Sequence, residues 1–429
     1  MKSIYRNVRL PEEYGFGSDG VCVVTDGKYI IYVGKDPATD KYDSDMDCGG
    51  DLLIPAFYNA HCHAAMTLFR GFGEDLPLDR WLNERIFPAE ERLNGGNVYD
   101  ASMLACAEMI RNGVVSFSDM YMFEESTARA VLETGMKANL SRNLVSFDPN
   151  IDFYKDRRFV ESCALERAYQ NAGEGRLKID LSLHAEYTNV ESYCRSAGEY
   201  AKERGIRVQL HLSETEKEQS ECIARHGKTP ARFFYDCGVF DAPTTAAHCV
   251  WVTDEDIALL AEKHVTVAHN PVSNLKLGSG VMPYRKLRDA GVNVALGTDG
   301  AASNNRLDIL RELQTAAILH KGVDRDPLAT GAREMLHMAT RNGALSQGRD
   351  DCGRIEAGMR ADLVLIDLHA PHNLPVYDTA ASLCFSVSSS DVRMTVSDGQ
   401  VLYRDGEYLT LDIDRVKAEF SYAAAHYFD

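Results

Sequence analysis

Two histidines separated by a single residue are the clearest candidates for chemistry in this chain. His61 and His63 follow the apolar run 52–57, which is typical of a buried strand. Residues i and i+2 of a strand point to the same face, so both imidazoles converge while Cys62 points away. Two imidazoles at the end of a strand suit a first-row metal ion, although an ordinary hydrogen-bonded pair of histidines gives the same pattern.

Three later β-rich runs also end in residues that bind metals or transfer protons, namely His211, His248 and Asp299. If these runs are strands of one parallel barrel, their carboxyl ends open onto a single face. Three neutral imidazoles and one carboxylate bind Zn²⁺ well and leave room for a water molecule. The sequence therefore predicts one metal site, with the ligands His61, His63, His211 and Asp299.

Glu214, three residues after His211, is the predicted general acid and base, because a carboxylate beside a dication is either a ligand or a proton carrier. His248 is expected to orient the metal's water and to stabilise the negative charge that develops on oxygen, with a core histidine as the alternative. Asp299 would hold the same water and accept a proton from it. For His269, core packing and substrate contact both stay open.

The elements that must position these residues are strands and helices in alternation. Amphipathic stretches such as 254–264, where Thr253 and Asp256 form a capping signature, lie between β-rich runs. Eight such units over residues 56–345 predict an α/β fold, a (β/α)₈ TIM barrel, and no glycine-rich dinucleotide or P-loop signature favours an open sheet instead. The eight runs begin near Ala56, Val114, Lys137, Lys178, Ile206, Thr244, His264 and Val292.

The two ends of the chain have a different rhythm, with short β-rich runs and turns. Residues 21–24 and 29–33 read as a hairpin around a Thr-Asp-Gly-Lys turn, and 361–367 and 392–396 are strand-like. We expect residues 1–55 and 346–429 to meet as one small β domain beside the barrel.

Composition limits the partners and the compartment. With 46 basic and 64 acidic side chains the formal charge is −18, which argues against nucleic acid and anionic membranes as partners. No apolar stretch approaches the length of a membrane span, and the first residues lack the apolar core of a signal peptide. The eleven cysteines include no C-x-x-C pair, which favours reduced thiols in a cytoplasmic protein.

Several of these motifs together resemble a known family. The stretches are 59–71, 75–78, 81–82, 211–215, 247–250, 269–278, 297–305 and 358–364. In this order they resemble the amidohydrolase superfamily and, within it, the branch of 5′-methylthioadenosine/S-adenosylhomocysteine deaminases. The resemblance covers nearly the whole chain.

The resemblance implies a mononuclear zinc deaminase on a distorted barrel, with a composite β-sandwich domain built from the two termini. Fe²⁺ is the alternative metal, and a homo-oligomer is the expected assembly. The implied substrate is a 6-aminopurine nucleoside, which loses ammonia and becomes the 6-oxo purine. The family's metal ligands coincide with the four named above, and its substrate-contacting positions fall on Glu90, Arg142, His184, Glu214 and Asp299. Glu90 and Arg142 rest on the resemblance alone.

One position departs from the family's pattern. The segment associated with His-(Ala/Ser)-Pro-Tyr reads His184-Ala185-Glu186-Tyr187 here. A charged Glu186 beside the pocket is expected to alter the preference for the 5′ part of the nucleoside. His184 also stands where binuclear relatives carry a bridging modified lysine, so a single metal is expected.

Two other functions fit much of the same pattern. The first is a related amidohydrolase that cleaves a different C–N or C–Cl bond, such as a guanine or pterin deaminase or a triazine hydrolase. The second is a catalytically silent scaffold, which would not carry stoichiometric zinc.

Overall fold

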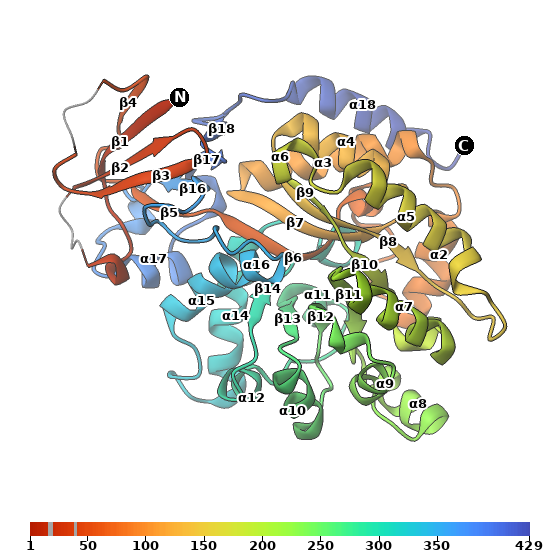
Figure 1. Cartoon of the computed structure of the whole chain (residues 1–429). Helices are drawn as coiled ribbons and strands as arrows, with labels where there is room; N and C mark the ends of the chain where they lie inside the picture. Colours follow the sequence, from red (N-terminus) through yellow and green to blue (C-terminus); the bar gives the residue numbers. More distant parts are fainter. Residues whose placement is uncertain (16–19, 38–40) are drawn as a thin grey trace.

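The computed structural model describes residues 1–15, 20–37 and 41–429. A curled parallel sheet surrounded by helices forms the larger part, and two further sheets lie together at one side of it (Figure 1). The α/β barrel with additional β sheets predicted from the sequence is therefore confirmed.

The strands of the curled sheet pair in parallel and in chain order, so their carboxyl ends share one face. Each predicted run contains one of them or begins just before it. They are β6 (Phe57–His63), β7 (Val114–Tyr121), β8 (Lys137–Leu144), β10 (Leu181–Leu183), β11 (Val208–Leu212), β12 (Thr244–His248), β13 (Thr266–His269) and β14 (Val294–Leu296), with the short β9 (Leu177–Ile179) beside β8.

The barrel closes through a change of partner near its last strand. β14 pairs with β13, but three residues later β15 (Asp299–Gly300) pairs with β6. Between them the Gly297 N–H donates to the carbonyl of His269 (2.9 Å) and the Thr298 N–H donates to that of His61 (3.1 Å). A Cβ on Gly297 would lie 2.9 Å from the Cβ of His61, so the close approach of the two segments requires glycine.

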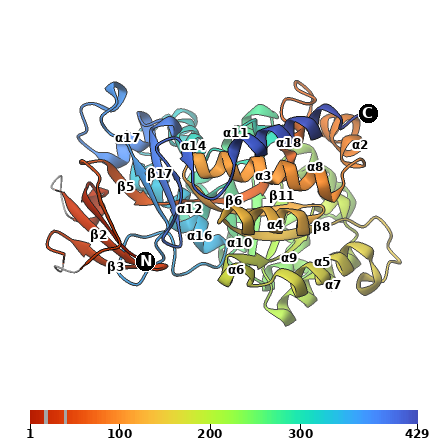
Figure 2. The ribbon, with the colours of Figure 1, turned by 90° about the horizontal axis from the view of Figure 1, so that it is seen from above.

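Helices between the strands cover the outside of the barrel (Figures 1 and 2). The helix predicted over 254–264 is confirmed, with a capping box formed by Thr253 and Asp256. The later helix α14 begins at Ile309, where the Asp308 side chain caps the N–H of Arg311. The helices of this region are α3 (Gly95–Arg111), α4 (Glu124–Thr134), α5 (Arg157–Tyr169), α6 (Ala172–Gly175), α7 (Glu191–Arg204), α8 (Glu216–His226), α9 (Pro230–Asp236), α10 (Asp254–Glu262), α11 (Pro271–Lys276), α12 (Tyr284–Asp289), α13 (Ala301–Asn304), α14 (Ile309–Asp324), α15 (Ala332–Ala339) and α16 (Arg341–Ser346).

A long connection between β6 and α3 covers the face where the strands end. It contains short helical turns, η2 (Ala64–Phe69), α1 (Leu78–Trp81), the π-helical η3 (Leu82–Ile86) and α2 (Phe87–Glu90). These turns supply apolar side chains above the ends of the strands, as described below.

The two chain ends build two sheets that pack on each other. The first pairs β3 (Tyr29–Gly34), β2 (Val21–Asp26), β1 (Lys2–Val8) and β4 (Ser44–Asp47), and the second pairs β19 (Glu407–Tyr408), β18 (Gln400–Arg404), β17 (Val392–Ser397), β16 (Leu363–Ile366) and β5 (Leu52–Pro55). β5 joins the carboxyl-terminal strands by pairing antiparallel with β16. Tyr5 and Val23 of the first sheet share a buried cluster with Leu53, Leu365 and Met394 of the second, so the sandwich is composite as predicted.

The last helix leaves the sandwich. After α17 (Thr379–Phe385) and the final strands, α18 (Ile413–Ala425) lies along α3 of the barrel (Figure 2). Val416 of α18 packs there against Met103 and Ala130. The division of the chain at residues 55 and 346 stays a prediction, since its second arm contains both sandwich strands and this barrel-packed helix.

Two further expectations concern the surroundings of the protein. Among the described residues, no helix combines the length and the apolar character needed to cross a membrane. All eleven cysteines are free thiols.

Candidate active site

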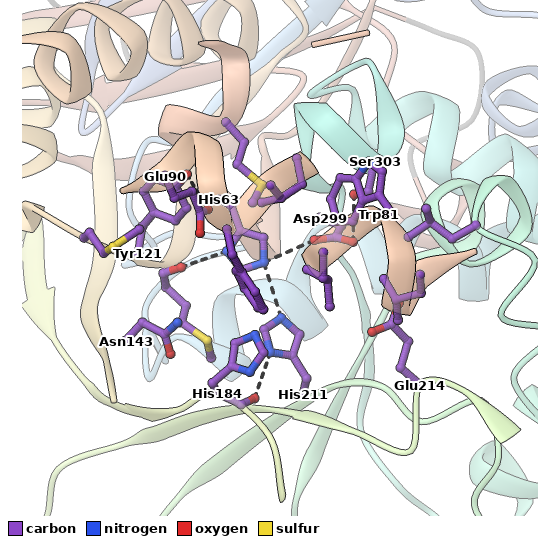
Figure 3. Close-up of a pocket in the computed structure, with 18 residues that line it drawn as sticks. His63, Trp81, Glu90, Tyr121, Asn143, His184, His211, Glu214, Asp299 and Ser303 are labelled. Carbon is purple, nitrogen blue, oxygen red and sulfur yellow. Dashed lines mark hydrogen bonds and ion pairs between the residues drawn. The ribbon is translucent and has the colours of Figure 1, made fainter. Parts of the chain in front are cut away.

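The four predicted metal ligands lie together at the carboxyl ends of the strands, and Figure 3 shows three of them, His63, His211 and Asp299. His61 and His63 come from β6, His211 from β11 and Asp299 from β15. The Nε2 atom of His63 lies 3.2 Å from Oδ1 of Asp299 and 3.3 Å from Nε2 of His211, and Nε2 of His61 lies 3.6 Å from the same Asp299 oxygen. The fold thus brings together residues separated by up to 238 positions, from 61 to 299.

Alternation along β6 explains how two of them share the site. His61 and His63 face the centre, whereas Cys62 is buried in the hydrophobic core outside it. Asp299 adopts a left-handed backbone conformation, with φ of +61°, immediately after the chain has crossed to β6. Strain of this kind in a non-glycine residue is common at functional sites.

Hydrogen bonds to carbonyls fix the tautomers of two ligands. Nδ1 of His63 donates to the carbonyl of Met120 (2.8 Å), and Nδ1 of His211 donates to the carbonyl of His184 (2.8 Å). A carbonyl only accepts, so the proton is on Nδ1 and the Nε2 lone pairs face the centre. This is the usual arrangement around metal-bound histidines.

The same centre needs a cation. Two Nε2 lone pairs 3.3 Å apart repel each other, and Nε2 of the buried His61 has no hydrogen-bond partner. Three nitrogens and one carboxylate oxygen within this space match the preference of Zn²⁺ and similar divalent ions. The residues present therefore fit a single divalent metal.

The pKa shifts of these residues are consistent with a cation at the centre. Burial, together with repulsion from neighbouring histidines, lowers the pKa of His61 to about 4 and that of His211 well below its ordinary value, so both are neutral. Burial also opposes the charge on His63, but its contact with Asp299 outweighs this effect and raises its pKa to about 9. The Asp299 carboxyl is buried too, yet its close contacts with the His61 and His63 imidazoles hold its pKa well below 3.8. The surroundings of His63 Nε2 therefore favour a positive charge at that point, and either a proton or a bound cation can supply it in place of the facing lone pair.

Two serines that the sequence did not single out hold Asp299 in place. The hydroxyls of Ser273 (2.6 Å) and Ser303 (2.9 Å) donate to Oδ2, which leaves Oδ1 directed at the histidines. Both serines lie within stretches that carried the family resemblance, 269–278 and 297–305, which is the only sequence signal that pointed to them.

Glu214, the predicted proton carrier, and His248, which is predicted to orient the water, face each other beside the predicted metal ligands. Oε2 of Glu214 lies 3.9 Å from Nε2 of His248. Burial raises the pKa of Glu214 above its ordinary value. Nδ1 of His248 donates to Oδ1 of Asn274 (2.8 Å), so the Nε2 lone pair points toward Glu214 and the centre. His248 also has a ring nitrogen within 4.8 Å of those of His61 and His211.

A cavity of about 70 Å³ lies against the predicted metal ligands. His63, His184, His211, Glu214 and Asp299 supply its polar wall, and Glu90 lies at the same cavity. Its apolar wall comes largely from the connection between β6 and α3, with Met66, Leu78, Trp81, Leu82, Ile86 and Phe87. A mostly apolar lining with a few convergent polar groups is typical of a small-molecule site.

The three residues taken only or partly from the resemblance have different positions. Glu90 accepts a hydrogen bond from the Tyr121 hydroxyl (2.7 Å), and burial raises its pKa to about 7. His184 lines the same cavity, is neutral with a pKa lowered to about 4 by burial, and contacts Thr188 through Nδ1 (3.1 Å). Arg142 lines a neighbouring cavity, which shares Glu90 with the first.

Arg142 is already paired. Its Nε donates to Oε2 of Glu161 (2.8 Å), and Oε1 of the same carboxylate accepts from Arg157 (2.7 Å). The neighbouring cavity therefore holds a neutralised guanidinium rather than a free positive charge.

The structure corrects the expectation for Glu186 and decides that for His269. The Glu186 carboxylate lines neither cavity; it is buried and bonded to Arg225 (2.6 Å) and His226 (2.9 Å) of α8, which explains how a charge is tolerated there. His269 is also buried outside the cavity, with its Nε2 3.0 Å from Nε2 of His320, so core packing is the correct interpretation.

Known proteins resemble this chain over almost its full length. Residues 52–402 match the Amidohydrolase family. A 5′-deoxyadenosine deaminase of Methanosarcina mazei is 42% identical over 409 residues, 94% of this chain and 93% of that protein. A 5-methylthioadenosine/S-adenosylhomocysteine deaminase of Moorella thermoacetica is 41% identical over 403 residues, 93% of each protein. The crystal structure of an adenosine deaminase from Xanthomonas campestris with bound zinc has a TM-score of 0.90 at 30% identity, over 99% of this chain and 98% of that one.

Proposed function

Because the chain belongs to the amidohydrolase family, we propose that it is a zinc-dependent deaminase of 6-aminopurine nucleosides of the adenosine type. It would convert the 6-amino purine to the 6-oxo purine and release ammonia. The observation that carries the proposal is the pairing of a metal-binding cluster with a protonatable Glu214 on one cavity wall. Relatives named as deaminases of this substrate class support it.

The metal would be held by His61, His63, His211 and Asp299. Zn²⁺ in such a site acts as a Lewis acid that makes hydroxide available from water at neutral pH. Fe²⁺ suits the same nitrogen and oxygen ligands. Ser273 and Ser303 fix the carboxylate that completes the ligand set.

Proton transfer is the task of Glu214. Burial raises its pKa and so favours the protonated form, and donation of that proton to N1 of the purine makes C6 electrophilic. Nε2 of His248 accepts a hydrogen bond from the attacking water and orients it, while Oδ1 of Asp299 can accept its proton. The proton held by Asp299 then passes to the amino group, which leaves as ammonia, and the remaining hydroxyl proton restores Glu214 as the 6-oxo group forms.

The remaining residues bind and enclose the nucleoside. The Glu90 carboxyl, held by Tyr121, accepts hydrogen bonds from ribose hydroxyls, and His184 contacts the purine. Trp81 and Ile86 cover the cavity and exclude bulk water, which strengthens each polar contact inside it.

Glu214→Gln tests the proposal. We expect turnover to fall by about 10²-fold or more, because glutamine cannot carry the proton, while metal content stays at one ion per chain. Glu203→Gln, on the exposed face of α7, is the matched control and should leave both unchanged. Near-parental turnover of Glu214→Gln would show that the assigned role is wrong.

A substrate panel separates the proposal from its alternatives. The panel contains adenosine, 5′-deoxyadenosine, 5′-methylthioadenosine, S-adenosylhomocysteine, guanine and a chlorotriazine, with ammonia or the ultraviolet shift as readout. Turnover of guanine or the chlorotriazine alone would replace the proposed substrate class. A purified protein without metal and without turnover would indicate a silent scaffold.

The state of Arg142 refines the expected preference. Because Glu161 and Arg157 already pair within that cavity, a substrate with a charged 5′ group must break an existing ion pair. We therefore expect short, neutral 5′ substituents to be favoured. Glu161→Gln, which frees Arg142, should raise kcat/KM for S-adenosylhomocysteine relative to 5′-deoxyadenosine by up to about tenfold.

A further inference from the structure

The carboxyl end of the chain reaches the wall of the active site. After α18 has run along α3, the last residues turn toward α2, and the C-terminus lies beside that helix (Figure 2). Tyr427 is only 8% exposed and joins a buried apolar cluster that contains Phe69, Trp81 and Ile86. Since Trp81 and Ile86 also line the cavity, Tyr427 packs directly behind the substrate-binding wall.

A single hydrogen bond connects this tyrosine to the residue before Glu90. The Tyr427 hydroxyl donates to the carbonyl of Ala89 at 2.7 Å, and both residues are buried. Its ring meets that of Phe69 edge-on, with centroids 5.4 Å apart. The ring contact fixes where the hydroxyl points.

The helix that carries Glu90 needs such support. α2, Phe87–Glu90, is the last turn of a helical stretch that runs without a break from Leu78 through η3, and the end turn of a helix frays because its last carbonyls lack partners within the helix. Tyr121 holds the Glu90 side chain, and Tyr427 holds the backbone one residue earlier. Two tyrosine hydroxyls from distant segments thus fix the position of one carboxylate.

The next residue anchors the tail from the other side. Phe428 stacks on Phe72 with centroids 5.3 Å apart, and the Arg92 guanidinium lies 5.8 Å above its ring. Phe72 precedes α2 and Arg92 follows it, so the tail contacts the chain on both sides of Glu90.

We propose that Tyr427 is a positioning residue for the nucleoside site, and that the last residues of the chain keep Glu90 where it can accept hydrogen bonds from the ribose hydroxyls. This inference rests on the function proposed above. The carboxyl terminus is then a part of the substrate site, although it is 337 residues from Glu90 in the sequence (427 − 90).

Binding of the 6-oxo products to the metal-loaded protein tests the inference without turnover. We would measure the dissociation constants of inosine and 2′,3′-dideoxyinosine by calorimetry for the wild type, for Tyr427→Phe and for a chain ending at residue 426. Loss of one neutral hydrogen bond should weaken inosine binding about 3- to 10-fold in Tyr427→Phe, and truncation should weaken it further. Binding of the dideoxy compound, which offers Glu90 no hydroxyl, should change less than twofold.

Kinetics and a control variant complete the test. With adenosine as substrate, Tyr427→Phe should raise KM by the same factor and leave kcat unchanged, because the reacting atoms are elsewhere. Tyr422→Ala, which removes an exposed tyrosine from α18, should change nothing. Equal weakening of both products, or unchanged inosine binding, would overturn the inference. Absence of adenosine turnover in a wild type that still distinguishes the two products would instead overturn the proposed function.

Discussion

The two ends of the barrel are both polar and buried, but they satisfy their polar groups in different ways. At the amino-terminal ends of the strands, Lys137 of β8 pairs with Asp362 and, at 2.9 Å, with Asp398. Tyr58 of β6 donates to Asp362 as well. At the carboxyl-terminal ends, the His61 Nε2 atom has no partner and two imidazole lone pairs face each other.

The difference separates stability from function. A buried lysine costs desolvation, and the carboxylates of the sandwich segments compensate for it, so this network fastens the barrel to the sandwich. At the carboxyl-terminal ends the protein supplies only part of the compensation, through Asp299, and the unpartnered His61 nitrogen suits a metal ion. We call the amino-terminal end, whose lysine is paired within the polypeptide, the complete end, and the carboxyl-terminal end, which we propose that a metal ion completes, the incomplete end.

The largest effect should follow from breaking the incomplete end. His211→Asn removes one metal ligand, so we expect loss of bound metal and a fall in turnover of more than about 10³-fold, because water then keeps its ordinary pKa. The protein should stay folded without metal, since the Lys137 network at the amino-terminal ends of the strands is intact. Metal analysis, kinetics and urea unfolding measure the three quantities. His264→Asn, at an exposed position with positive φ that asparagine tolerates, is the control. Unfolding of the His211 variant at low urea would contradict the separation.

Breaking the Lys137 network at the complete end should instead lower the stability of the fold and leave metal binding and turnover unchanged. Lys137→Met leaves the buried Asp362 carboxylate without its cation, whereas Asp398 keeps Arg360 at 3.3 Å, and the free energy of unfolding should fall by about 3–5 kcal/mol. The metal content and the kcat of the folded fraction should stay unchanged. Lys137→Met combined with Asp362→Asn removes the orphaned charge and should regain part of the loss. A kcat that falls together with stability would mean that the two ends are coupled.

The sequence predicted the incomplete end better than the complete one. His61, His63, His211 and Asp299 each end a β-rich run, and the topology of a parallel barrel alone brings such ends together. Lys137 begins a run, where a charge reads as the solvated start of a strand. Its partners come from segments more than 200 residues away, and no local pattern encodes that pairing.

The residues around the proposed substrate site were even harder to predict from the sequence. Glu90 and Arg142 look like surface charges in the sequence, because a single helical turn and a strand end give no periodic signal. Glu186 appeared to face the pocket only because it replaces a proline beside His184, and its partners on α8 could not be read from that motif. Spacing predicts which residues converge, whereas the direction of a side chain depends on contacts made by other segments.

Removing one serine hydroxyl at each end should have a smaller effect, and only the change at the incomplete end should alter metal affinity. Ser273→Ala removes a 2.6 Å hydrogen bond to the ligand Asp299, and residues that orient metal ligands in this way typically contribute 10- to 100-fold to metal affinity. We expect about tenfold weaker metal binding in competition with a chelator. Ser397→Ala, which removes the 3.4 Å contact to Lys137 at the other end, should leave metal affinity unchanged. Equal metal affinity in the two variants would remove the assigned role of Ser273.

The smallest expected effect is on the pH dependence of the free energy of unfolding. The sign of this dependence should differ between the two ends. Glu312 of α14 supports the loops around the metal site by accepting from the Val272 N–H (3.1 Å) and from Asn304 (2.7 Å). Burial raises its pKa to about 8 from 4.5, so between these values the folded state holds a proton that the unfolded state has lost. Its contribution is therefore full below about pH 4.5 and declines as the pH rises through 8. Asp362 is buried as well, but Lys137 holds its pKa below 3.8, so its contribution is lost only as the pH falls below that value.

Urea unfolding between pH 2.5 and 9 separates these contributions. Glu312→Gln should remove a decline of up to about 1.4 kcal/mol per pH unit between pH 5 and 8 and leave the acid side unchanged. Lys137→Met should flatten the acid side, because Asp362 then loses the cation that favours its charged form, and should keep the decline above pH 5. If Glu312→Gln altered the acid side instead, the buried carboxyl groups of the two ends would not be independent, and the metal end would share the electrostatic support of the end that closes against the sandwich.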